Sequence, residues 1–250
     1  MGKVIKKLCL ALLLLNSVIL TAHAENKPLR VAIAQLTSPF VMQGNNQVYG
    51  FDIAMLSYLC PLIHRDCQFQ LMDFDKILPA VAANKVDIGV GGITITPERA
   101  KTVNFSIPYF SSETQFLGKK DFSKKPFTIQ LLEKTTFGVQ TGTIFAEEIK
   151  SLGLVNPSIT NFEQEASLIE AVSDGTVDLA LVDQSTAMYW QGHSGDQLIA
   201  LDKPMTYGFG FGVAVSPADP DLLTAINQAI TQYKNSNEFK TNVLMYLNYF

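Results

Sequence analysis

The sequence predicts an α/β protein of two similar lobes, and an internal repeat is the main reason. Residues 78–90, LPAVAANKVDIGV, resemble residues 169–181, IEAVSDGTVDLAL, at a constant offset of 91 positions. Each copy reads as the end of a helix, a short turn and a buried strand. Apolar strands alternate with helical segments elsewhere in the chain, which is typical of sheets flanked by helices. The alternative is a chance match between two ordinary helix-to-strand segments.

The elements before the second copy fit this plan. We expect a strand over residues 29–34 and a helix over residues 50–63, with Asp52 as its N-cap. Residues 68–72 are the next expected strand. The first repeat copy then leads into the loop Gly91–Thr96, at the carboxyl end of its strand, where open α/β sheets bind ligands.

The second lobe is expected to begin with the stretch TFGVQTGT, a strand followed by a helix start at residues 141–143. The second repeat copy leads into the loop 182–186. Residues 208–215 read as a glycine-rich strand, and a helix follows from Asp219 to about Tyr233. We expect extended crossings between the lobes near residues 112–118 and 206–212.

The lobe ranges follow from these elements. Residues 1–24 read as a secretory signal peptide, because Lys3, Lys6 and Lys7 precede an apolar stretch that ends in Ala-His-Ala. An uncleaved anchor is the alternative, although the apolar part is short for a membrane span. Residues 25–112 with 209–250 are then assigned to the first lobe, and residues 113–208 to the second.

Export determines how charge and cysteines are interpreted. Loss of three lysines changes the formal net charge from −4 to −7, which argues against nucleic-acid binding. In an oxidising compartment Cys60 and Cys67 read as one disulfide across a small loop. The alternative, a metal site, has only His64 and Asp66 nearby as further ligands.

Arg99 is the most informative residue of the first loop. If Thr96 caps a helix that starts at Pro97, Arg99 lies where a capping box wants Glu or Gln, and where the helix dipole disfavours a cation. A guanidinium suits a carboxylate, and Thr94 adds a hydroxyl. A solvated surface arginine is the alternative.

The second lobe offers the complementary groups. Thr141-Gly142-Thr143 lies at an expected helix start, and Asp183 follows the second buried strand. Loops of the two lobes would thus present a cation and an anion, a pattern complementary to a zwitterion. The alternatives are that Asp183 caps the next helix, that residues 141–143 are only a turn, and that Phe40 and Phe74 are core residues.

The whole mature chain resembles the bacterial periplasmic solute-binding proteins of family 3, which deliver polar amino acids to ABC importers. The resemblance rests on GFDIAML, DFDKILPAV, VDIGVGGITITPERAKTVNFSIPYF, GVQTGT and VDLALVD, in this order. It implies a type II periplasmic binding protein with two crossing hinge strands and closure around the ligand. It also implies a periplasmic location, a free L-amino acid as ligand, an inner-membrane ABC permease as partner and a monomer.

The resemblance assigns residue roles as well. Arg99 would hold the ligand α-carboxylate, assisted by Thr94 and Thr143, whereas Asp183 and the backbone of Gly92 would hold the α-ammonium. Phe74 would pack against the ligand side chain, and in binders of basic amino acids the matching cysteines form a disulfide.

Ligand choice is less determined. The stretch before Pro39-Phe40 has no acid, and Thr37 occupies the position where the family has an aromatic residue. Gln140 in GVQTGT resembles arginine-type members, and Asp73, Asp75 or Glu113 are candidates to reach the pocket. We expect arginine or another basic amino acid, with glutamine next because GGITIT also resembles glutamine binders.

An enzymatic role is a different class of hypothesis. A few relatives of this fold are dehydratases, and Glu113 is the candidate general base. The chain has no H-E-x-x-H, G-x-S-x-G or phosphate-loop motif, so we expect no catalytic residues, cofactor or metal. A structural or adhesive surface role is a third hypothesis, and it predicts no stabilisation by small molecules.

Overall fold

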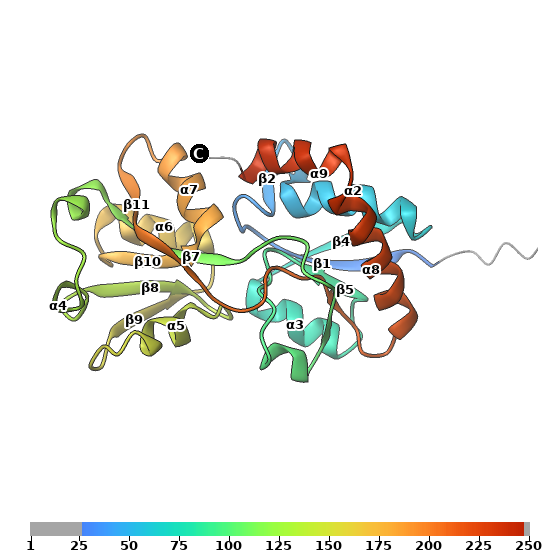
Figure 1. Ribbon diagram of the computed structural model, residues 1–250, viewed down its shortest axis with the longest axis horizontal. Helices are drawn as coiled ribbons and strands as arrows, with labels where there is room; N and C mark the ends of the chain where they lie inside the picture. The colour runs from blue at the N-terminus through green and yellow to red at the C-terminus, as the bar shows by residue number, and fades with distance from the viewer. Residues whose placement is uncertain (1–26, 248–250) are drawn as a thin grey trace, which may run out of the picture.

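The computed structural model describes residues 27–247, so the expected leader lies outside the described residues. Two five-stranded mixed sheets form the centres of two lobes that lie side by side (Figure 1). The predicted fold class is confirmed: each lobe is a mixed sheet with helices packed against it. No helix in the described part of the chain is long and apolar enough to cross a membrane.

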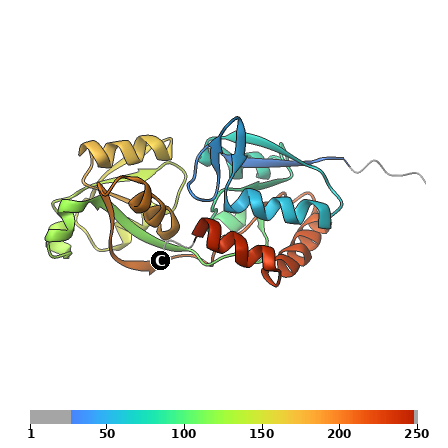
Figure 2. The same ribbon diagram turned by 90° about the horizontal axis from the view of Figure 1, so that it is seen from above.

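The first lobe contains a sheet of order β4-β1-β5-β12-β6 and a small β2-β3 hairpin. Its strands are β1 (Leu29–Ala34), β2 (Met42–Gly44), β3 (Gln47–Tyr49), β4 (Cys67–Met72), β5 (Ile88–Val90), β6 (Asn104–Phe105) and β12 (Ala214–Val215). Its helices are α2 (Phe51–Leu62), α3 (Phe74–Ala82), α8 (Pro220–Lys234) and α9 (Asn237–Asn242), with a 3₁₀ turn at Arg99–Lys101 and a π turn at Val243–Leu247. Figure 2 shows α2 beside α8 and α9, where they share one apolar cluster.

The second lobe contains a sheet of order β11-β7-β10-β8-β9. Its strands are β7 (Glu113–Lys119), β8 (Thr136–Gln140), β9 (Ser158–Phe162), β10 (Leu179–Asp183) and β11 (Leu198–Thr206). Its helices are α4 (Ile129–Leu132), α5 (Phe145–Ser151), α6 (Glu165–Asp174) and α7 (Gln184–His193), with a 3₁₀ turn at Lys120–Lys124. Strands β8, β9 and β10 run parallel, so their carboxyl ends lie at one edge of the sheet.

The internal repeat has a structural counterpart in both sheets. In the first lobe Asp87 donates its amide to the Arg30 carbonyl and accepts the Arg30 amide on its carboxylate. Asp178 makes the same pair of contacts with Thr136 in the second lobe. The repeated Val-Asp therefore ties the strand that follows it to the first parallel strand of each lobe.

Two segments connect the lobes, one before β7 and one after β11 (Figure 1). They pair with each other through an antiparallel bridge between Phe110 and Phe211, and Ser112 donates its hydroxyl to the Tyr207 carbonyl. The exact limits of the lobes stay a prediction.

The expected strand over residues 208–215 is wrong for most of its length, because only β12 is extended in the sheet. Gly208 and Gly210 have φ of 73° and 94°, a region that favours glycine. A Cβ on Gly208 would lie 2.7 Å from the Ile95 carbonyl oxygen. The glycines thus permit a tight crossing instead of a regular strand.

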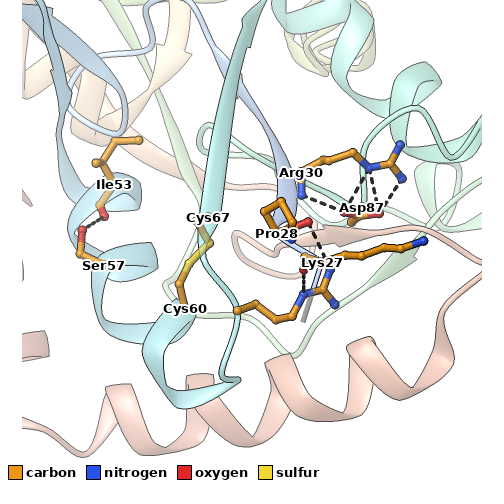
Figure 3. Close-up of a disulfide and its surroundings, with 9 residues drawn as sticks. Lys27, Pro28, Arg30, Ile53, Ser57, Cys60, Cys67 and Asp87 are labelled. Atoms are coloured by element: carbon orange, nitrogen blue, oxygen red, sulfur yellow. Dashed lines mark hydrogen bonds and ion pairs between the residues drawn. A yellow bond between two sulfur atoms is a disulfide. The ribbon is translucent and has the colours of Figure 1, made fainter. Parts of the chain in front are cut away.

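The predicted disulfide between Cys60 and Cys67 is confirmed (Figure 3). It joins the last turn of α2 to the first residue of β4, and the two Cα atoms are 6.0 Å apart, within the usual range. The close-up also shows the ion pair between Arg30 of β1 and Asp87, the residue directly before β5.

Candidate functional site

A cavity lies between the two lobes and is lined by residues of both. All eight ligand-binding residues that the sequence suggested line this one cavity. It is lined by Thr37, Phe74, Gly91, Gly92, Thr94, Arg99, Gln140, Thr143, Ile144, Phe145, Glu165, Leu168, Val182, Asp183 and Thr186. The fold therefore brings together residues that are up to 149 positions apart in the chain.

Arg99 supplies the positive charge of the cavity. Its guanidinium donates to the Thr94 carbonyl at 2.8 Å and, across to the second lobe, to the Gly142 carbonyl at 2.9 Å. Its Cζ atom lies 5.8 Å from the centre of the Phe74 ring, within cation–π range. Burial lowers the pKa of Arg99 to about 10, so the group stays cationic at neutral pH.

The local structure around Arg99 differs from the expected helix. Thr96 accepts the Arg99 amide on its hydroxyl at 3.2 Å, as a cap would, but only a three-residue 3₁₀ turn follows. A turn of this length has no appreciable macrodipole, because the dipole is a sum over many aligned peptides. The unfavourable-dipole argument for Arg99 is therefore wrong, and hydrogen bonds to carbonyl oxygens determine its position.

Asp183 supplies the opposite charge from the end of β10. One carboxylate oxygen, Oδ1, is buried and has no hydrogen-bond partner. Although Asp183 precedes α7 at the N-cap position, its side chain makes no capping bond, so the capping interpretation is wrong. Burial raises the pKa of Asp183 well above its usual value, against the opposing effect of Arg99.

The glycine loop after β5 is held by Asp52, which the sequence analysis misassigned. Gly50 is the N-cap of α2, and Asp52 lies within the first turn, fully buried. Its carboxylate accepts the amides of Gly91 and Gly92 at 2.8 and 2.9 Å and the Tyr109 hydroxyl at 3.0 Å. Burial raises its pKa to about 6. The sequence signal that could have identified Asp52 as a buried acid is its position between two apolar residues, Phe51 and Ile53.

Gly92 lies against the core residue Phe40. Its φ is 66°, and a Cβ there would lie 2.7 Å from the Phe40 ring. Phe40 is fully buried and packs edge-on against Phe211 at 4.8 Å, so the alternative that it is a core residue is correct. Phe74, by contrast, both belongs to an apolar cluster and lines the cavity.

The remaining predicted residues contribute polar groups to the walls. Thr143 donates its hydroxyl to the Gln140 carbonyl at 2.6 Å. Thr94 is buried, and its carbonyl is occupied by Arg99. Thr37 is also buried, and its hydroxyl oxygen has no partner. The cavity thus keeps unsatisfied polar atoms on both lobes, at Thr37 and Asp183.

Glu165, the first residue of α6, is a lining residue that the sequence analysis missed. It is 3% exposed, and both carboxylate oxygens accept the backbone amide of Ser38 in the first lobe, at 3.2 and 3.1 Å. Trp190 donates its indole N–H to the same carboxylate at 2.8 Å. Burial raises the pKa of Glu165 to about 7. The glutamate-rich stretch around it contained no motif that singled it out.

Hydrogen bonds join the lobes around the cavity. Arg99 reaches Gly142, Ser38 donates its amide to Glu165, and Thr186 donates its hydroxyl to the Ser38 carbonyl at 2.6 Å. Both polar groups of the Ser38 backbone are held by the second lobe. The structure is that of a closed protein.

The other acidic candidates do not line the cavity. Asp73 lines a neighbouring pocket, where Gln35 donates to it, and Asp75 pairs with Lys76. Glu113 begins β7 and is absent from the cavity wall. Within residues 27–247 no three His, Cys, Asp or Glu gather as ligands for a metal ion.

Comparison with known proteins decides the family. The model of the bacterial extracellular solute-binding proteins, family 3, matches residues 29–249. The chain belongs to this family. Extracytoplasmic binding of a polar solute through two closing lobes is the function of such proteins, and the fold described above is theirs.

Individual relatives are similar at moderate identity. ABC transporter arginine-binding protein 1 of Escherichia coli (strain K12) is 28% identical over 94% of this chain and 96% of its own length. The crystal structure of an arginine 3rd transport system periplasmic binding protein from Legionella pneumophila has a TM-score of 0.81 at 26% identity, over 88% of this chain and 100% of that one. The crystal structure of an ancestral amino acid-binding protein, a precursor of cyclohexadienyl dehydratase, has a TM-score of 0.80 at 28% identity. The match covers 90% of this chain and 97% of the ancestral one.

Proposed function

We propose that this family 3 protein binds a free basic L-amino acid, with arginine favoured, and delivers it to an ABC importer. The observation that carries the proposal is that Arg99 and Asp183, two opposite charges from different lobes, line the same cavity. A zwitterion matches this arrangement, since each of its charges meets an opposite charge. The names of the arginine-binding relatives support arginine as the first ligand to test.

The geometry of the walls supports the following residue roles. Arg99 binds the α-carboxylate, assisted by the Thr94 hydroxyl and by Thr143, whose hydroxyl proton turns from the Gln140 carbonyl to the ligand. Asp183 binds the α-ammonium through the oxygen that has no partner in the structure, together with the backbone of Gly92. Each ligand charge needs such a partner because burying an unpaired charge costs several kcal/mol.

The side chain of the ligand would lie along the wall formed by Phe74, Gln140 and Thr37. Phe74 offers a ring face to the apolar stem of the ligand, and Gln140 and Thr37 offer polar atoms to its end. Thr37 occupies the position where the family has an aromatic residue, and it offers a hydroxyl oxygen that has no hydrogen-bond partner.

A melting-temperature screen tests the proposal. Ligand-free mature protein is heated with each of the twenty amino acids at about 1 mM, where a micromolar binder gains roughly 4 kcal/mol of stability. We expect a large shift with arginine and lysine. A shift with glutamine alone would instead support a glutamine-binding member, and no shift with any amino acid would overturn the transport proposal.

Catalysis is the second candidate, since the chain is similar to a precursor of a dehydratase. Glu113 lies outside the cavity wall, so the general base first considered for that reaction has no access to a bound ligand. We propose a binding protein and not an enzyme. Incubation with prephenate or arogenate, followed by an absorbance scan, should show no conversion above the buffer blank.

The cellular setting belongs to the same proposal. We infer a monomer in the periplasm of a Gram-negative cell, exported by the leader at residues 1–24, with an inner-membrane permease as partner. Size-exclusion chromatography with light scattering on mature protein tests the monomer, and fractionation of cells that express the full chain tests the location.

A further inference from the structure

The cavity contains one more negative charge than a zwitterion requires. Among its lining residues Arg99 is the single cation, whereas Asp183 and Glu165 are both acids. The two charges of an amino-acid backbone would be matched by Arg99 and Asp183. Glu165 is then left over, and no lysine or arginine within residues 27–247 forms an ion pair with it.

The contacts of Glu165 suit a carboxylate that accepts hydrogen bonds. The Ser38 amide and the Trp190 indole N–H are both donors, and both point to its oxygens. A neutral carboxylic acid would have fewer acceptor sites for them. These donors therefore fix the side chain in the wall and favour its ionised form, against the cost of burial.

An ionised carboxylate that is 3% exposed and has no counter-ion is costly. Two events remove that cost: the carboxylate takes up a proton, or a cation arrives beside it. Burial favours uptake of a proton, because it raises the pKa of Glu165 to about 7. A ligand with a positively charged side chain would supply the second.

Thr37 gives an independent sign that this side of the cavity awaits a polar ligand group. It is 6% exposed, it directly precedes Ser38 in the chain, and its hydroxyl oxygen has no hydrogen-bond partner. A hydroxyl in that state can accept a hydrogen bond from an ammonium or guanidinium group.

We propose that Glu165 is the specificity-determining residue of the cavity, and that its charge favours amino acids with a cationic side chain over neutral ones of the same shape. The proposal rests on the proposed function and names the substrate class of the same site. It also accounts for the absence of an acid in residues 34–37 of the first lobe. The selecting charge comes from the second lobe, at the start of α6.

Preference for a cation then depends on pH. The groups that face this region are Arg99, Asp183 and Tyr189, whose phenol senses Glu165 electrostatically, and the charges of Asp52 and Glu148 also act on Asp183. Arginine and citrulline share the same backbone and nearly the same shape, so the ratio of their affinities cancels the contacts with the backbone. The other acids still act on the cationic side chain, so the difference in this ratio between wild type and Glu165→Gln reports on Glu165.

The first test compares L-arginine with L-citrulline by isothermal titration calorimetry at about pH 8.5, where Glu165 is ionised. Wild type should prefer arginine, and Glu165→Gln should reduce that preference at least about tenfold. Glu163→Gln is the matched control, because it removes the same charge two residues away from a side chain that does not line the cavity. Its preference should stay within about twofold of wild type.

The second test follows wild type and Glu165→Gln across pH. Between about pH 8.5 and pH 5.5 Glu165 becomes protonated, so wild-type preference for arginine over citrulline should fall several-fold and by more than in Glu165→Gln. If Glu165→Gln and low pH both leave the preference unchanged, or if Glu163→Gln alters it equally, the inference is wrong while amino-acid binding stands. If wild type binds no amino acid, the proposed function fails and the inference with it.

Discussion

The guanidinium of Arg99 donates a hydrogen bond to the backbone carbonyl of Gly142, across the gap between the lobes, at 2.9 Å. Arg99 follows the loop after β5 of the first sheet, and Gly142 follows β8 of the second. This contact can form only when the lobes are closed. The same side chain thus links the proposed carboxylate site to lobe closure.

Replacement of Arg99 should nearly abolish ligand binding. Arg99→Ala removes the cation of the cavity wall and leaves the ligand carboxylate buried without a partner. We expect a loss of at least about 3 kcal/mol, or a hundredfold in Kd, measured by calorimetry with arginine. Arg30→Ala is the control, because Arg30 pairs with Asp87 outside the cavity. A loss below about fivefold in Arg99→Ala would contradict the proposed role.

The hydroxyl of Thr186 should contribute to closure and not to the open protein. Thr186→Val keeps the shape of the side chain but leaves the Ser38 carbonyl without its donor in the closed state. We expect about 1–2 kcal/mol weaker ligand binding, or roughly five- to thirtyfold. Ser185→Ala, the neighbouring position outside the cavity wall, is the control. Equal affinities in the two variants would show that this bond does not stabilise closure.

The fold and the polar residues of the site were largely predictable, for a physical reason. Strands such as β1 and helices such as α8 carry local signals, the apolar run of residues 29–34 and the Asp219 cap, which the structure reproduces. Arg99 and Asp183 follow buried strands, and strand ends meet at the cleft of such sheets.

The residues that were missed or misplaced depend on contacts between distant parts of the chain. Asp52 resembles a helix cap until the glycine loop, 39 positions further on, is seen to donate to it. Glu165 has a partner in the other lobe, 127 positions away. Residues 208–212 were expected to be part of a strand because of their apolar pattern. That pattern does not reveal the positive φ angles of Gly208 and Gly210, which replace the strand by a tight crossing.

Asp52 should be a major determinant of stability in the first lobe. Asp52→Asn removes the charge that accepts three hydrogen bonds on Oδ2, and its amide can keep a carbonyl oxygen there only by burying an NH₂ group at the position of Oδ1, which has no partner. We expect the free energy of unfolding to fall by about 2–3 kcal/mol in urea. Asp66→Asn, at an exposed position, should change it by less than about 0.5 kcal/mol. A similarly small change in Asp52→Asn would show that the loop is held by other contacts.

The disulfide should stabilise the fold without affecting the ligand. Closing a loop with a sequence separation of 7 restricts the unfolded chain only modestly. The double variant Cys60→Ala/Cys67→Ala should therefore lose about 2 kcal/mol of unfolding free energy. Because neither cysteine lines the cavity, its Kd for arginine should match that of wild type. A change in Kd beyond about threefold would indicate coupling between the disulfide and the site.

Mild acid should stabilise the ligand-free protein, provided that it is closed as in this structure. Burial raises the pKa of Asp52 to about 6 and that of Glu165 to about 7, and it raises the pKa of Asp183 as well. Unfolded carboxyl groups titrate near about pH 4, so the folded state binds more protons between about pH 4 and pH 7. The free energy of unfolding should therefore rise as the pH falls through that window.

Urea unfolding at about pH 8, 7, 6 and 5 measures this dependence, and we expect a total gain of about 1–3 kcal/mol towards pH 5. Glu165→Gln should flatten the part of the curve near its pKa of about 7 and leave the part near pH 6 intact, because Asp52 still titrates there. A stability that falls steadily from pH 8 to pH 5 would mean that these carboxyl groups are hydrated in the ligand-free protein. Opening of the lobes would hydrate Glu165 and Asp183 and remove their stabilising effect at low pH. Asp52 is buried within the first lobe, so its effect near pH 6 would remain.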